Sequence, residues 1–257
     1  MTTTPKLWRA FQQANTTDTG TNGDDQIGIR MVALANGNFI ALWQSNTDDG
    51  AGFTGGNDVI GQLFDAEGNA IGAEFRANDT FNADDEGRID AVGLPNGNFA
   101  VVFEDTDVNG TSIRFNIRGA DGSFVSSGTI APDSNADIIG GPKITVNTDG
   151  SFLVAYQQRD TVNNQTDTFA TIVNSSGTAG SPFLLLSGNL SADVGSGGEQ
   201  VDVTTLTNGN YVIIARQIDG DNGFHMRIVN STGGNVLGFT EVSGTIGDGD
   251  TDVAPTV

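Results

Sequence analysis

The segment LANGNFIALWQS (residues 34–45), followed by VIGQLFDAEGNAIGAEF (residues 59–75), decides the fold of this chain. It contains four short apolar runs, which are separated by Asn36-Gly37, by an acidic loop that includes Asp48, and by Glu67-Gly68. Asn-Gly between alternating apolar runs is a strong hairpin signal, because both central residues of a type I′ turn need a positive φ. The segment therefore predicts four consecutive antiparallel strands, with a type I′ turn at Asn36-Gly37.

The same unit recurs along the chain. The first turn glycine returns at steps of 60, 53 and 59 residues, and the second at steps of 54, 55 and 56 residues. Four strands per unit of about 55 residues, with the second strand the most apolar, favour an all-β fold of the β-propeller class. Tandem β-sandwich domains are the alternative, but they need about 100 residues each. A single propeller domain over residues 1–257 is expected, with units at about 27–82, 83–137, 138–192 and 193–246.

Polarity distinguishes the strands within a unit. The second strands, such as residues 99–103, are apolar at nearly every position, so both of their faces are expected to be buried between neighbouring blades. In the third strand of the second unit, Arg114, Asn116 and Arg118 alternate with apolar residues. That alternation predicts a place nearer a solvent edge.

The two ends of the sequence resemble parts of a further unit. Residues 5–15 resemble a fourth strand, and residues 252–257 resemble a first strand, so an incomplete fifth unit is expected. Three interpretations follow. The sequence is a fragment of a longer repeat protein, its terminal strands close an irregular ring, or these strands pair with another copy in an oligomer or filament, since unpaired strand edges favour association.

Composition limits the partners. The formal net charge is −21, from 32 acidic and 11 basic residues, which opposes nucleic acid and anionic membranes and favours cations. The sequence has no cysteine, so disulfides and thiol chemistry are excluded. No apolar run approaches the roughly 20 residues of a membrane span, and no apolar signal-peptide core is evident near the N-terminus. Membrane insertion and a cleaved N-terminal signal are therefore not expected.

The segments quoted first resemble the propeller-type repeats of large bacterial proteins of the RTX, haemolysin-type calcium-binding class. Such proteins leave the cell by type I secretion with an uncleaved C-terminal signal. The resemblance implies an extracellular or cell-surface location. The tandem Gly-Gly-x-Gly-x-Asp repeat of that class is not found in this sequence. The resemblance therefore implies location more strongly than calcium β-roll sites.

A candidate calcium loop lies between the second and third strands of the second unit. It reads DTDVNG (residues 105–110), with oxygen-bearing side chains at alternate positions and glycine at the sixth, like the first half of an EF-hand loop. The twelfth position is Asn116 rather than the glutamate of an EF-hand. The alternative is a solvated turn in which Asx side chains bond to the backbone. The candidate calcium ligands are Asp105, Asp107 and Asn109, with Asp48, Asp219 and Asp221 in equivalent loops.

No catalytic signature stands out. The one histidine, His225, lies on a predicted strand, no serine stands in a Gly-x-Ser-x-Gly elbow, and acidic residues recur in every unit without one pair being singled out for glycosidase chemistry. A non-enzymatic structural or adhesive module is therefore expected, self-assembling through its terminal strands and stabilised by calcium. The alternative is a carbohydrate-binding or glycan-processing propeller that contacts surface glycans. Trp8 is the candidate contact for a sugar or protein partner.

Overall fold

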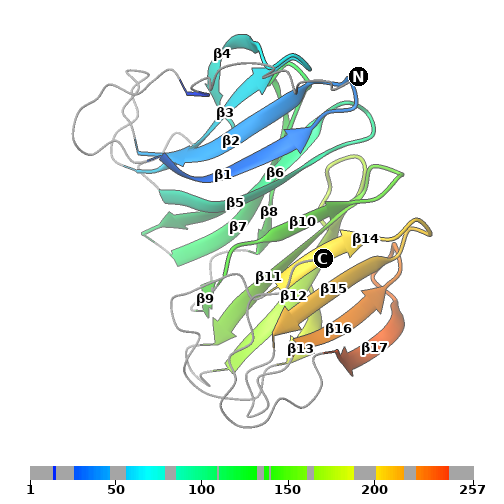
Figure 1. The fold of residues 1–257 in the computed structure, drawn as a ribbon. Coiled ribbons are helices and arrows are strands. Elements are labelled where there is room, and N and C mark those ends of the chain that lie inside the picture. The colour runs from blue at the N-terminus through cyan, green and yellow to red at the C-terminus, as the bar shows by residue number, and fades with distance from the viewer. Residues whose placement is uncertain are drawn as a thin grey trace, which may run out of the picture.

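The computed structural model describes residues 14–15, 26–46, 56–78, 85–108, 110–131, 136–138, 140–160, 165–187, 201–216 and 224–242. Their regular structure consists of strands in four antiparallel sheets, which succeed one another in chain order from β1–β4 to β14–β17 (Figure 1). This arrangement confirms the predicted all-β propeller with four full units. None of the described segments forms a helix of the length and hydrophobicity needed to cross a membrane.

Each sheet is one blade whose strands pair in sequence order. The first two blades are β1 (Gln26–Ala33), β2 (Phe39–Ser45), β3 (Asp58–Phe64) and β4 (Ala70–Arg76), then β5 (Asp85–Gly93), β6 (Phe99–Asp107), β7 (Gly110–Arg118) and β8 (Phe124–Ala131). The last two blades are β10 (Lys143–Val146), β11 (Phe152–Asp160), β12 (Gln165–Val173) and β13 (Phe183–Ser187), then β14 (Val201–Thr205), β15 (Tyr211–Arg216), β16 (Phe224–Val229) and β17 (Asn235–Glu241). A short strand, β9 (Ala136–Ile138), also pairs with β11.

The first hairpin turn contains three residues rather than two. Gly37 N donates to Leu34 O over 3.0 Å, and Leu34 N donates to Asn38 O over 2.8 Å. Gly37 has a φ of 87°, whereas Asn36 does not adopt a positive φ. The hairpin prediction is confirmed, but the type I′ prediction is wrong. The loop is a type I turn closed by a left-handed glycine, and the Asn36 side chain stabilises it by accepting a bond from Asn38 N over 3.0 Å.

Apolar second strands form the interfaces between blades. Ile40 and Leu42 of β2 pack with Val101 and Phe103 of β6 in one buried cluster, and similar clusters join the second blade to the third and the third to the fourth. Burying one such side chain stabilises the fold by about 1.5–3 kcal/mol. These clusters confirm that both faces of the second strands are buried.

The solvent-edge prediction for the third strand is wrong. Asn116 and Arg118 on β7 are both buried. Asn116 Nδ2 and Arg118 Nε donate to Ala77 O of the first blade over 2.8 and 3.0 Å, and Arg118 Nη2 donates to Asn78 O over 2.8 Å. The alternating polarity predicted that these side chains contact water, but their hydrogen-bond partners are backbone carbonyls of the neighbouring blade.

The first strands β1, β5, β10 and β14 lie side by side from blade to blade (Figure 1). We call them the inner strands. On β5 and β10, Ile89 and Ile144 are buried, whereas Ile29 and Met31 of β1 are 59% and 71% exposed. The described residues place no blade beside that face of β1. The predicted incomplete fifth unit (5–15 and 252–257) lies outside the described residues, apart from residues 14–15.

Candidate functional site

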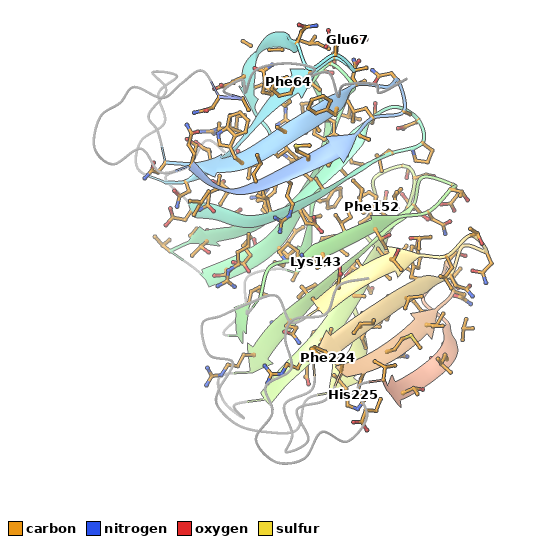
Figure 2. All side chains as sticks on the ribbon, viewed as in Figure 1. Phe64, Glu67, Lys143, Phe152, Phe224 and His225 are labelled. Carbon is orange, nitrogen blue, oxygen red and sulfur yellow. The ribbon has the colours of Figure 1, made fainter. Side chains whose placement is uncertain are left out.

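A charged residue occupies the same repeat position on every inner strand. In each blade it lies opposite a residue of the second strand, and that residue comes five positions after the first turn glycine. In the first blade, for example, Arg30 pairs with Leu42, five residues after Gly37. The four charged residues are Arg30, Asp90, Lys143 and Asp202. Their charge therefore alternates in sign from blade to blade. Figure 2 shows Lys143 on β10 of the third blade, which lies between the second and fourth blades.

Asp90 joins three blades. Its Oδ1 lies 3.4 Å from Arg30 Nε on β1, and its Oδ2 accepts a hydrogen bond from Ile144 N on β10 over 3.1 Å. Burial raises the pKa of Asp90, while the Ile144 hydrogen bond and the charges of Lys143 and Arg30 oppose this rise. Asp90 is therefore a partly buried carboxyl group that neighbouring cations help to ionise.

Arg88 and Glu104 form a second pair in the same blade. Arg88 lies in a register shift between Gly87 and Asp90, with a φ of 46°, and its Nη1 donates to Glu104 Oε1 on β6 over 3.3 Å. Burial raises the pKa of Glu104 to about 7, against the opposing charge and hydrogen bond of Arg88. A carboxyl group with this pKa can hold a proton near neutral pH and release it, as a general acid must.

Glycines occupy the position equivalent to Arg88 in the first and third blades. Arg88 lies two residues before the charged residue of its inner strand. The residue two positions before the charged residue is Gly28 in the first blade and Gly141 in the third. A Cβ at Gly141 would lie 2.9 Å from Arg88 Cβ and 3.1 Å from Arg88 O, whereas a Cβ at Gly28 would meet nothing within 4 Å. Among these three equivalent positions, Arg88 is the one residue with a side chain.

The two carboxyl groups lie on one face of the second blade. Asp90 pairs directly with Val102, and Glu104 is two residues further along β6, so all three side chains point the same way. Glycosidases use a pair of carboxyl groups that flank the glycosidic bond, and two carboxyl groups on one face of a blade are the starting point for such a pair. We call Arg30, Arg88, Asp90, Glu104 and Lys143 the inner-strand charge cluster.

The structure places the predicted calcium ligands differently from the sequence. Asp105 lies within β6 rather than in a loop, because β6 and β7 remain paired as far as Asp107 and Gly110. It is buried, and its Oδ2 lies 2.9 Å from Arg114 Nη1. The other predicted site residues, Asn109, Asp48, Asp219, Asp221 and Trp8, lie outside the described residues.

Calcium binding stays a prediction. Within the described ranges, no three acidic or histidine residues are grouped so that they could hold a metal ion. His225 lies on β16 of the fourth blade, away from Lys143 and the inner strands (Figure 2).

Sequence reasoning missed the inner-strand charge cluster. Aligning the four units on their turn glycines would have revealed the alternating charges, and it would have set Arg88 against two glycines. No sequence signal indicated the burial of Glu104, because it directly precedes the predicted acidic loop at residues 105–110.

No family model and no curated protein matches this chain. Solved structures share its fold. An α-L-arabinanase from Penicillium chrysogenum is 16% identical with a TM-score of 0.52, over 87% of this chain and 68% of that one. A PL25 ulvan lyase is 11% identical with a TM-score of 0.51, over 87% and 59%. The polysaccharide lyase Uly1 is 13% identical with a TM-score of 0.50, over 83% and 48%. This chain thus spans about half to two thirds of the length of these proteins.

These similarities correct the functional expectation. The solved propellers of this shape include enzymes that are named for action on polysaccharides, so the expected non-enzymatic structural or adhesive module is wrong. The alternative, a glycan-processing propeller, agrees better with them. At these identities the similarity establishes the propeller fold alone. The substrate and the reaction depend on the residues of this chain.

Proposed function

We propose that this chain cleaves glycosidic bonds by hydrolysis at the inner-strand charge cluster. The observation that carries the proposal is Glu104, a buried carboxyl group whose pKa lies near 7 and whose partner is the guanidinium of Arg88. A proton donor to a leaving sugar oxygen needs a raised pKa of this kind, because an ordinary glutamate has lost its proton at neutral pH.

The neighbouring residues have complementary roles in this scheme. Glu104 donates its proton to the glycosidic oxygen as the bond to the sugar carbon breaks. Asp90 is the second carboxylate, and the Ile144 hydrogen bond and the charges of Lys143 and Arg30 favour its ionised form. It takes a proton from the water molecule that adds to the sugar carbon, which completes the hydrolysis. Arg88 orients the Glu104 carboxyl group through the hydrogen bond from its Nη1.

The comparisons support cleavage of a glycan without specifying the reaction. One of the solved structures is named an α-L-arabinanase, whereas the other two carry polysaccharide lyase in their names. Hydrolysis fits the described residues better, because Glu104, which is buried, and Asp90, which is partly buried, share one face of the second blade and both have a raised pKa.

The test is a cleavage assay on neutral and acidic polysaccharides, following new reducing ends and, separately, unsaturated sugar ends. We expect reducing ends without unsaturated ends. Glu104→Gln and Asp90→Asn should each lower the rate by about 10²-fold or more, while Glu67→Gln at an exposed turn leaves it unchanged. Unsaturated products, or a rate that survives Glu104→Gln, would overturn the assignment of Glu104 as the acid.

A further inference from the structure

The two arginines of the inner-strand charge cluster are each more accessible than the carboxylate that they pair with. In the Arg88–Glu104 pair, the arginine side chain is 54% exposed and the glutamate 11%. In the Arg30–Asp90 pair, the arginine is 33% exposed and the aspartate 18%. A ligand that approaches the inner strands therefore meets guanidinium groups first, although the chain as a whole carries a formal charge of −21.

The backbone around Arg88 is shaped to present this side chain. Arg88 is the one non-glycine residue in the described part of the chain with a positive φ, whereas Gly28 of the first blade holds a φ of 68° at the equivalent position. An L-residue in this conformation costs about 1–2 kcal/mol relative to its ordinary backbone. Gly141 lets the third blade approach the Arg88 backbone closely. A strained backbone that persists in this way is characteristic of binding and catalytic sites.

The guanidinium of Arg88 keeps donors for a ligand. A guanidinium has five N–H donors, and the bond to Glu104 uses the Nη1 group. Its planar fork matches a carboxylate with two parallel hydrogen bonds, which a lysine cannot reproduce. Lys143 on β10 is buried, so it adds positive charge to the site without offering a contact.

We propose that the glycan bound at this cluster is acidic, and that Arg88 holds the carboxylate of a uronic acid residue while Arg30 adds a second positive charge from the neighbouring strand. This inference rests on the proposed function, since it names the substrate class of the same site. Neutral sugars offer uncharged hydroxyl oxygens, which form weaker hydrogen bonds with a guanidinium than a carboxylate does.

Calorimetric titration with three short oligosaccharides of one backbone tests the proposal: a uronic acid trimer, its carboxyl-reduced neutral counterpart, and a neutral trimer bearing sulfate esters. We expect the uronate trimer to bind at least 10-fold more tightly than the other two. Arg88→Gln should abolish that difference, and Arg88→Lys should retain only part of it because the fork is lost. Arg227→Gln on β16 of the fourth blade serves as the matched control and should keep the full preference. Thermal melts of each variant establish that it is folded.

The outcomes separate this inference from the proposed function. Equal affinity for the uronate and reduced trimers overturns the acidic-substrate proposal, and equal affinity for the sulfated trimer overturns its carboxylate specificity. In either case, cleavage of neutral glycans that depends on Glu104 would leave the proposed function standing. Uronate binding that depends on Arg88, without cleavage of any glycan, would support the ligand class and overturn the hydrolase.

Discussion

Gly141, just before the inner strand of the third blade, lies directly against Arg88 of the second blade. A Cβ at Gly141 would come within 2.9 Å of Arg88 Cβ and 3.1 Å of Arg88 O. This contact couples the position of Arg88 to the packing of two blades.

Gly141→Ala should therefore destabilise the protein and displace Arg88. Overpacking of this kind costs about 1–3 kcal/mol, because backbone rather than a flexible side-chain end has to move. Urea unfolding measures the loss. Gly87→Ala is the matched control, since a Cβ there would lie 3.4 Å from the Gln44 side chain, which is ordinary contact. Equal stability of the two variants would contradict the close approach.

Replacing Arg88 tests the backbone strain. In a Glu104→Gln background, which removes the charge partner, Arg88→Gly should be more stable than Arg88→Ala by about 1–2 kcal/mol, since glycine adopts a φ of 46° without a Cβ clash. Denaturant unfolding of the two double variants gives the difference directly. If alanine proves as stable as glycine, Arg88 does not hold this conformation in solution.

Glu104 should make stability depend on pH. Its folded pKa is about 7 and its unfolded value is 4.5, so the folded state binds more protons between these two values. The free energy of unfolding should therefore decrease as pH rises through this window, by on the order of 3 kcal/mol in total. Urea unfolding at about pH 5 and about pH 8 measures this slope. Glu104→Gln should flatten the curve by that amount, and an unchanged slope would show that Glu104 has an ordinary pKa.

Asp105 should behave as a structural residue. Asp105→Ala removes the partner of Arg114 in a mostly buried pair and should cost about 1–3 kcal/mol, whereas Asp107→Ala, at the more exposed end of β6, should cost much less. Thermal or urea unfolding with excess chelator compares the two variants. If the loss for Asp105→Ala is much larger in millimolar calcium than in chelator, the calcium prediction would be favoured instead.

Equivalent positions on two inner strands should respond differently to truncation. Ile144 and Met31 each follow the charged residue of their strand, yet Ile144 is 6% exposed and Met31 is 71% exposed. Ile144→Ala should cost about 2–4 kcal/mol, and Met31→Ala should change the free energy of unfolding by less than about 0.5 kcal/mol. A comparable loss at Met31 would indicate that this face is covered in solution.

The architecture was predictable because its signals are local. The turn glycines recur at a nearly constant spacing, and the second strands are apolar on both faces, so the four blades follow from short segments such as residues 34–45. Local signals gave a wrong prediction where the same residue types are compatible with two backbone conformations. Asn36-Gly37 also fits a three-residue turn, and Asp105 reads as a loop residue although β6 continues through it.

By itself the sequence determined the all-β repeat, its four blades and the strongly acidic surface, because turn conformation, strand amphipathicity and net charge depend on neighbours along the chain. Only the tertiary structure decided which charges meet. Asp90 contacts residues of the first and third blades, and the pKa of Glu104 rises because other strands exclude water from it. These effects depend on distance in space and on burial, and neither quantity is encoded in the order of residues around Asp90 or Glu104.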